Sequence, residues 1–235
     1  MSSSMTELES DLVGLDPGDF DIIEWRADAL KSCTQSDCLA GLNAIRGCLG
    51  QDIPILFTLR RHNEGGFFEG SVSAYADIIL SAAQSEAADL VDAELSAGDT
   101  CIREVTAAAS LGGARVVVSH HNFKHTYNSD VIVSIYEQMF KLNADISKVA
   151  LMPASFSDCV TAMQAAETIR RNHPDRAVTM ISMGRHGLAS RIMAQEFGSV
   201  ITFGALEPEK ASAPGQISAR DLRTIHRILK KYAVI

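Results

Sequence analysis

The stretch "DISKVALMPAS", residues 145–155, places a lysine inside a run that otherwise has the apolar character of a buried strand. Burying an ammonium group without a partner is costly, so Lys148 either reaches water or has a chemical use. Lys148 lies between Ile146 and Ala150, where a desolvated amine is favoured over its charged form. We favour the second interpretation, that Lys148 has a chemical use.

Other β-like runs surround this one in the sequence. They are "FDIIEWRAD" (20–28), "IPILFTLR" (53–60), "DLVDAEL" (89–95), "ARVVVSHHNF" (114–123), "AVTMISMG" (177–184) and "SVITFGA" (199–205), which with "SKVALMP" (147–153) make seven expected strands. Between them, apolar residues recur at the spacing of a helix face. Examples are Leu42, Ile45 and Leu49; Ile132, Ile135, Met139 and Leu142; and Leu222, Ile225 and Leu229.

This alternation of strands and helices predicts right-handed βαβ units and a parallel sheet. No linker-like stretch divides the chain, so we expect one domain over residues 1–235. The number of repeats favours a TIM-type (β/α)8 barrel. A doubly wound open sheet is the alternative, but no GxGxxG motif follows a strand, which weakens its nucleotide-binding version.

Composition restricts the class of partner. The formal charge is −8 and no basic block offsets it, so neither nucleic acid nor a membrane surface is an expected partner. No apolar run has the length of a membrane span, and the first residues lack the features of a signal peptide. These observations predict a cytoplasmic protein that acts on a small molecule. Five scattered cysteines without a CxxC pair predict reduced thiols and no disulfide.

Polar residues gather where the expected strands end. Alternate residues of a strand share a face, which pairs Glu24 with Arg26, Thr58 with Arg60, Asp92 with Glu94, Ser119 with His121, Ile146 with Lys148, and Ser182 with Gly184. In a closed parallel barrel the carboxyl ends of the strands and the following loops form the active site. The charges that are scattered along the sequence are thus expected to converge.

Each of these residues also has a structural interpretation. Glu24 with Arg26, or Arg60 with Glu64, could form ion pairs at the rim of the barrel. The histidines near residue 121 could be ordinary surface or core residues; a metal site is not expected, since no zincin-type glutamate accompanies them. Lys148 could extend its ammonium group to water at the barrel mouth. The functional interpretation is preferred because six strands would otherwise collect polar residues at one end by chance.

Seven segments together resemble the motif series of the type I 3-dehydroquinate dehydratases. They are "EWRAD" (24–28), "FTLRRHNEGG" (57–66), "VDAEL" (91–95), "SHHNF" (119–123), "ISKVALMP" (146–153), "SMGRHGLASR" (182–191) and "ASAPGQIS" (211–218). Seven motifs in one order are far more specific than any single motif. The resemblance implies a homodimeric lyase that converts 3-dehydroquinate to 3-dehydroshikimate and water in the shikimate pathway, which leads to the aromatic amino acids, with no cofactor or metal.

The resemblance also implies roles for individual residues. Lys148 would form a Schiff base with the substrate ketone, His121 would be the general base and acid, and Glu64 would orient or polarise His121. The substrate-binding residues implied are Glu24, Arg26 and Arg60 for the ring hydroxyls, and Arg191, Ser212 and Gln216 for the carboxylate. An arginine fork with two neutral donors suits a planar carboxylate.

The sequence departs from the family pattern at three places. Asn122 follows the expected base where the family has aspartate, which removes a charge beside His121. Tyr127 follows Thr126 where the family commonly has proline. The family's first strand has no counterpart, because "MTELESDLVGLDPGD" (5–19) has a helical pattern. The gap could narrow, with water or side chains satisfying its edges, or another chain could cover it. We favour a natural protein that begins upstream of Met1, and we expect a chain lacking that strand to melt at a lower temperature than an extended one.

Two other classes of protein remain open. A class I aldolase would also use a barrel lysine, but aldolases of phosphorylated sugars generally place glycine-rich phosphate sites after the last two strands. Here the corresponding loop is "SAPGQ" (212–216), which suits a carboxylate better. A binding or regulatory relative with an incomplete barrel is the non-enzymatic alternative.

Overall fold

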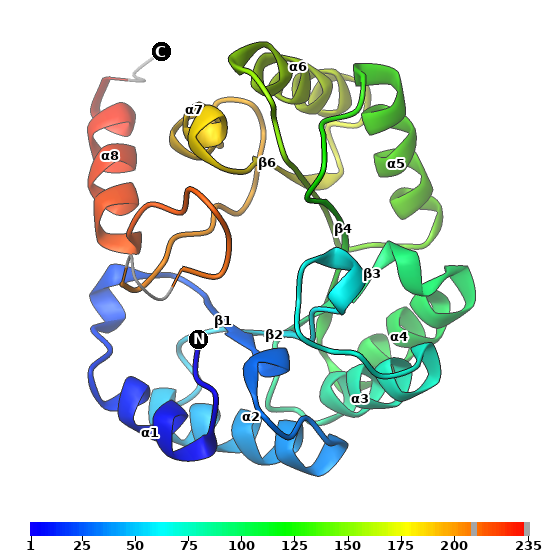
Figure 1. Ribbon diagram of the computed structural model, residues 1–235, viewed down its shortest axis with the longest axis vertical. Coiled ribbons are helices and arrows are strands. Elements are labelled where there is room, and N and C mark those ends of the chain that lie inside the picture. The colour runs from blue at the N-terminus through cyan, green and yellow to red at the C-terminus, as the bar shows by residue number, and fades with distance from the viewer. Residues whose placement is uncertain (208–210, 233–235) are drawn as a thin grey trace. The chain divides into compact units, whose positions relative to one another are not determined.

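A computed structural model describes residues 1–207 and 211–232 of the chain (Figure 1). The chain folds into two compact units. The first comprises Met1–His120 with Met139–Ile146, and the second comprises His121–Gln138 with Ser147–Ile235. The expectation of a single domain over residues 1–235 stays a prediction.

Among the residues that the structure describes, six strands follow one another in the sheet in chain order. They are β1 (Ile23–Arg26), β2 (Ile55–Thr58), β3 (Leu90–Glu94), β4 (Arg115–Asn122), β5 (Ile146–Leu151) and β6 (Ala177–Ser182). Within the first unit β1, β2, β3 and β4 pair in parallel. Parallel neighbours require a crossover, and a helix supplies it after each of these strands. Six of the seven expected strands are therefore confirmed.

In the described ranges, eight α-helices separate or flank the strands. They are α1 (Met5–Val13), α2 (Gln35–Leu49), α3 (Val72–Gln84), α4 (Asp99–Gly112), α5 (Ser129–Lys141), α6 (Phe156–Asn172), α7 (Leu188–Ile192) and α8 (Ala219–Tyr232). Short 3₁₀ turns follow several strands, among them η2 (Ala27–Ala29) and η3 (His62–Glu64). None of the helices in the described ranges is long and apolar enough to span a membrane.

Local sequence explains where several helices begin. Helices α2 and α6 each start with a capping box. The N-cap side chain, Thr34 or Ser155, accepts a hydrogen bond from the backbone N–H three residues later. The side chain of that later residue, Asp37 or Asp158, accepts a hydrogen bond from the backbone N–H of the N-cap residue. In the first unit α1 packs against α2, and α3 against α4 (Figure 1). In the second unit α6 and α7 pack on β6.

The side of α2 that faces the sheet is the apolar side expected from its sequence. Leu42 and Ile45 are fully buried. Gly41 lies where a β-carbon would stand 2.2 Å from the ring of Trp25, so the indole of β1 packs directly on the helix backbone. Only glycine permits that approach without displacing Trp25.

The segment ahead of β1 is helical, as its pattern predicts. Met5–Val13 forms α1 and Pro17–Asp19 forms a 3₁₀ turn, η1. Leu8 and Leu12 are buried. Among the described residues no strand precedes β1.

The expectation of a seventh strand at "SVITFGA" (199–205) is wrong. Only isolated bridges form there, from Ser199 to Val178 and from Ala205 to Ser218. Side-chain oxygens replace ladder partners: the Met180 N–H donates to Ser199 Oγ at 3.0 Å, and the Ile201 N–H donates to the Thr179 hydroxyl at 3.3 Å. Hydroxyls that accept backbone hydrogen bonds interrupt the ladder, which apolar periodicity alone does not reveal.

Candidate active site

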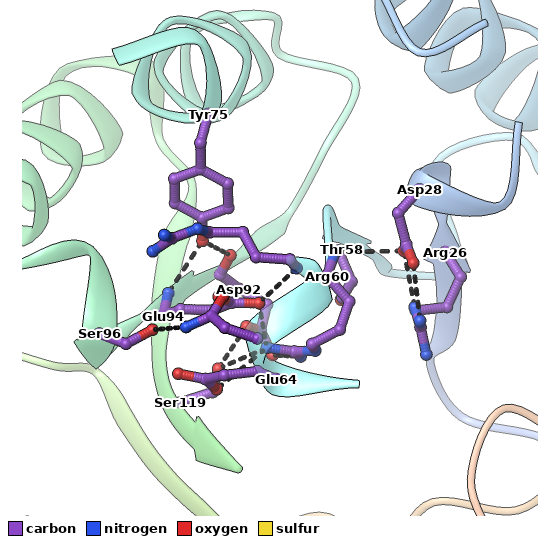
Figure 2. A network of polar contacts seen from close by, with 12 residues as sticks. Arg26, Asp28, Thr58, Arg60, Glu64, Tyr75, Asp92, Glu94, Ser96 and Ser119 are labelled. Carbon is purple, nitrogen blue, oxygen red and sulfur yellow. Dashed lines mark hydrogen bonds and ion pairs between the residues drawn. The ribbon is translucent and has the colours of Figure 1, made fainter. Parts of the chain in front are cut away.

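In the first unit, the guanidinium of Arg60 is the centre of a buried polar network (Figure 2). Arg60 follows β2, and its side chain is 4% exposed. It donates to Asp92 at 2.8 Å and to Glu94 at 3.1 Å, both on β3, and to Ser119 Oγ on β4 at 2.9 Å. Glu64 lies 4.0 Å away on the loop after β2. The expected convergence of polar residues from successive strands is thus observed in this unit.

The charges of this network alter one another's pKa. Burial acts to lower the pKa of Arg60, but the carboxylates of Asp92 and Glu94 outweigh it and hold the pKa well above its ordinary value. Burial raises the pKa of Glu64 to about 7, the negative charge of Glu94 adds to the rise, and Arg60 opposes it. Burial also raises the pKa of Glu94. A carboxyl that titrates near neutrality can exchange a proton during a reaction.

Sequence reasoning noted Asp92, Glu94 and Ser119 as strand-end residues but gave them no role. Ser119 Oγ donates to Asp92 at 2.6 Å, and the Arg61 N–H donates to Glu94 at 2.8 Å. The hydroxyl of Tyr75, on α3, accepts a hydrogen bond from the Glu94 N–H at 2.9 Å. These contacts orient the two carboxylates toward Arg60. The acidic motif "VDAEL" was the available signal, whereas Tyr75 lies in an ordinary helical pattern.

Glu24 and Arg26, both on β1, have different partners from Arg60. Thr58 donates its hydroxyl hydrogen to Glu24 at 3.0 Å, which links β1 to β2. Arg26 makes two hydrogen bonds of 2.7 Å to Asp28. Asp28, whose side chain has no exposed surface, also accepts the backbone N–H groups of Arg60 and Phe67 at 3.1 Å. Asp28 therefore fixes the loop after β2 against the end of β1, a function that the sequence motif did not suggest.

Replacing Glu64 with glutamine should stabilise the protein more at about pH 8 than at about pH 5. The folded-state pKa of about 7 exceeds the ordinary 4.5, so the folded protein holds the proton more tightly and wild-type stability falls as the pH rises between these values. Glutamine removes that loss, which is on the order of 2 to 3 kcal/mol. Urea unfolding at both pH values measures it. The control is Glu69→Gln at an exposed position; equal effects of Glu64→Gln at both pH values would contradict the prediction.

In the second unit, Lys148 is a buried residue of β5. It is 4% exposed, and its Nζ stands 4.2 Å from the centre of the Phe203 ring. Ala150, two residues along the same face, packs with Ile181 and Met183. The placement of the lysine in a buried strand is as expected, and the ring contact with Phe203 was not foreseen.

Arg191 in α7 is among the largest fully buried side chains. It donates to the carbonyl oxygens of Phe203 at 3.1 Å and Pro214 at 3.4 Å. No carboxylate of the described residues pairs with it, and its Nε has no hydrogen-bond partner there. Burial lowers its pKa to about 10, so it remains charged at neutral pH. A buried guanidinium whose charge is not neutralised favours an anionic ligand.

Ser212 and Gln216 belong to the loop that contacts Arg191. The Ser212 N–H donates to the Gln216 side-chain oxygen at 2.7 Å, and the Gln216 amide donates to Ser212 Oγ at 3.1 Å. Between them, the Pro214 carbonyl also accepts the Gly184 N–H at 2.9 Å. The structure thus brings "SAPGQ" together with the "SMGRHG" loop and with Arg191.

His121 lies near the end of β4 and is half-buried. The neighbouring His120 belongs to the first unit, and burial lowers its pKa. The two departures from the family pattern that follow His121 contact each other, since Asn122 donates its amide hydrogen to the Tyr127 hydroxyl at 2.7 Å. Asn122 also accepts the backbone N–H groups of residues 124 and 125, which closes the turn after β4. An amide can donate to Tyr127 where a carboxylate could only accept.

Parallel strands in chain order, with buried charged groups at their carboxyl ends, are typical of (β/α)-barrel enzymes. The family model described as "Type I 3-dehydroquinase" matches residues 1–233. A 3-dehydroquinate dehydratase from Escherichia coli O17:K52:H18 is 37% identical over 229 residues, covering 97% of this chain and 90% of that protein. The chain belongs to the type I 3-dehydroquinase family, and it is an enzyme of the hydro-lyase class.

Solved structures agree with this assignment. The type I 3-dehydroquinate dehydratase from Clostridium difficile is 32% identical and superposes with a TM-score of 0.93, covering 98% of this chain and 90% of that one. The enzyme from Geobacillus kaustophilus is 34% identical, with a TM-score of 0.89 and coverages of 98% and 87%. The expected TIM-type barrel class is therefore confirmed.

Proposed function

We propose that this 3-dehydroquinate dehydratase forms a Schiff base between Lys148 and its substrate, and that the reaction is a step of the shikimate pathway toward the aromatic amino acids. The observation that carries the proposal is the burial of Lys148 on β5, beside the Phe203 ring and the apolar residues of the same unit. The amine of a lysine is a nucleophile that can condense with a ketone to form an imine. The structure of the Clostridium difficile relative is described as containing covalently modified comenic acid, which supports covalent chemistry in the family.

The reaction divides into steps that balance in atoms and protons. The amine of Lys148 condenses with the C3 ketone and releases water, which leaves an iminium ion. His121 removes a proton from C2, and the iminium nitrogen accepts the electron pair as an enamine. The enamine then expels the C1 hydroxyl, which leaves as water after His121 returns the proton. Hydrolysis of the new iminium releases 3-dehydroshikimate and restores the lysine.

The substrate carboxylate is proposed to bind Arg191, Ser212 and Gln216. The charge of Arg191 and its Nε without a hydrogen-bond partner in residues 1–207 and 211–232 support this role. Two neutral donors on the same loop complete a site for a planar anion.

The ring hydroxyls are proposed to bind Glu24, Arg26 and Arg60, with Glu64 acting on His121. Asp92, Glu94 and Ser119 already accept hydrogen bonds from Arg60, which holds its guanidinium in one orientation. The raised pKa of Glu64 is compatible with a group that shares a proton during turnover. A homodimer and a cytoplasmic location stay predictions.

A dehydration assay tests the proposed activity against the alternatives. The purified chain is mixed with 3-dehydroquinate and the conjugated enone of the product is followed by its absorbance. An enzyme of the proposed function produces the enone, whereas an aldolase or a binding protein does not. Absence of enone formation by folded protein would overturn the proposal.

His121→Ala should lower kcat by about two to four powers of ten, the usual scale of general acid and base catalysis, and His120→Ala should lower it far less. Adjacent strand residues face opposite sides, so only one of them can face the substrate. Steady-state kinetics of the two variants make the comparison, and each serves as the control for the other. A larger loss for His120→Ala would show that the assigned base is the wrong histidine.

Arg191→Lys should raise KM for 3-dehydroquinate about 10- to 100-fold with little change in kcat. An ammonium group cannot reproduce the fork of an arginine, and a hydrogen bond to a charged group contributes about 1.5 to 3 kcal/mol. Such a loss affects ground state and transition state equally. The matched control is Arg170→Lys on the exposed side of α6. An unchanged KM, or a loss confined to kcat, would contradict the carboxylate-binding role.

A further inference from the structure

Two cysteine thiols in the first unit touch each other. Cys33 Sγ and Cys38 Sγ lie 3.4 Å apart at the beginning of α2. Cys33 precedes the N-cap Thr34 and is partly exposed, while Cys38 is 1% exposed. All five cysteines are free thiols. The sequence analysis did not predict this contact, because the two cysteines lie five positions apart and do not form a CxxC pair.

The helix cap holds both cysteines in place. Thr34 Oγ1 accepts the Asp37 N–H at 3.2 Å, and the Asp37 carboxylate accepts from the backbone and side chain of Thr34 and from Ser32. The Cys38 N–H donates to the Thr34 carbonyl at 3.0 Å. The sulfurs would have to approach by about 1.4 Å to reach bonding distance.

The two thiols differ in reactivity. The hydrogen bond from Cys38 lowers the pKa of Cys33, although burial and the carboxylates of Asp28 and Asp37 oppose it. The same hydrogen bond, together with burial, raises the pKa of Cys38. Cys33 is therefore suited to attack an oxidant and Cys38 to complete the exchange, since the thiolate is the reactive form. Cys48 is more exposed, but the described residues place no second thiol against it.

We propose that Cys33 and Cys38 form a reversible dithiol–disulfide site that is oxidised by low-molecular-weight disulfides of the glutathione class. The Cys33 thiolate attacks one sulfur of oxidised glutathione, forming a mixed disulfide and releasing one glutathione thiolate. Cys38 loses its proton and attacks Cys33 Sγ, which forms the protein disulfide and releases the second glutathione. Both protein thiols are oxidised and one glutathione disulfide is reduced to two thiols.

The site adjoins the segment that carries Arg26 and Asp28. The Cys33 thiol contacts the carbonyl oxygen of Ala27 at 3.3 Å, in the turn η2 between these two residues. When Cys33 is in a disulfide it has no S–H group to donate to the Ala27 carbonyl. The Leu30 N–H still donates to that carbonyl at 3.1 Å. Oxidation therefore acts on the turn that follows β1.

Peptide mapping of the folded chain tests the proposal. The protein is incubated with oxidised glutathione, remaining thiols are alkylated, and the product is cut with trypsin. Cys33 and Cys38 fall in one tryptic peptide, residues 32–46, and Cys48 falls in the next. The expected product is a 32–46 peptide that lacks both alkyl groups and two hydrogen atoms, which returns to the dithiol form on reduction.

Single variants separate the two steps. Cys38→Ser should stop the reaction at a mixed disulfide on Cys33, and Cys33→Ser should leave the buried Cys38 unmodified. Cys48→Ser is the control and should react as the wild type does. Circular dichroism shows whether each variant is folded. If Cys33→Ser or Cys38→Ser is unfolded, the peptide maps of the wild type and of Cys48→Ser test the proposal by themselves. Glutathione attached to Cys48 while peptide 32–46 keeps both thiols would overturn the proposal.

Discussion

Lys148→Ala should abolish measurable dehydration of 3-dehydroquinate, with kcat lowered by about 10⁴-fold or more. The nitrogen of the proposed iminium accepts the electron pair that remains when the substrate loses its C2 proton. Alanine has no nitrogen that could form this iminium. Steady-state kinetics over long incubation measure the residual rate. Borohydride added to the wild type with substrate should trap the adduct as covalent mass on Lys148, and the variant should gain none.

The structure offers a matched control for this prediction. Lys141→Ala removes an exposed lysine at the end of α5 and should leave kcat unchanged. Because Lys148 is buried against the Phe203 ring, the variant must also be shown to be folded, by circular dichroism and urea unfolding. A folded Lys148→Ala that dehydrates its substrate at a near-normal rate would eliminate the imine mechanism.

Arg60→Met should lower the free energy of unfolding by about 3 to 5 kcal/mol near neutral pH and remove activity. Methionine keeps much of the volume but leaves the buried carboxylates of Asp92 and Glu94 without their cation. The loss should shrink as the pH falls, because burial already raises the pKa of Glu94 and of Glu64, and protonation removes the repulsion. Urea unfolding between about pH 5 and pH 8 measures both effects.

Arg115→Met is the comparison for this variant. Arg115 also pairs with an aspartate, Asp145 at 2.9 Å, but its side chain is 72% exposed. Water screens such a pair, so its loss should change stability far less than the loss of Arg60. If the two variants change the free energy of unfolding by similar amounts, burial does not determine how much the ion pairs of Arg60 contribute to stability.

Much of the secondary structure could be predicted from apolar periodicity. The runs around Trp25, Phe57 and Val91 are strands, and the face of Leu42 and Ile45 packs inward. The segment 199–205 has an equally apolar pattern yet forms only isolated bridges, because the hydroxyls of Ser199 and Thr179 take the place of backbone partners. Periodicity reports which face is apolar, and it does not report which atoms satisfy the backbone.

The candidate site was predictable to a similar degree. The resemblance selected Arg60 and Glu64, and the structure places them 4.0 Å apart. It did not select Asp28, which accepts two hydrogen bonds from Arg26 and the backbone N–H of Arg60. Hydrogen bonds of this kind depend on loop conformation, which residue identity constrains only weakly.

The sequence by itself determined the alternation of strands and helices, the family, and the position of a lysine in an apolar strand. Tertiary structure alone decided which charges neutralise one another. The carboxylates of Asp92 and Glu94 reach Arg60 across more than thirty residues of chain, and the contact of Cys33 with Cys38 depends on how one helix begins. Local patterns follow from the geometry of the backbone, whereas ion pairing and pKa depend on distance and burial, which exist only once the strands have packed.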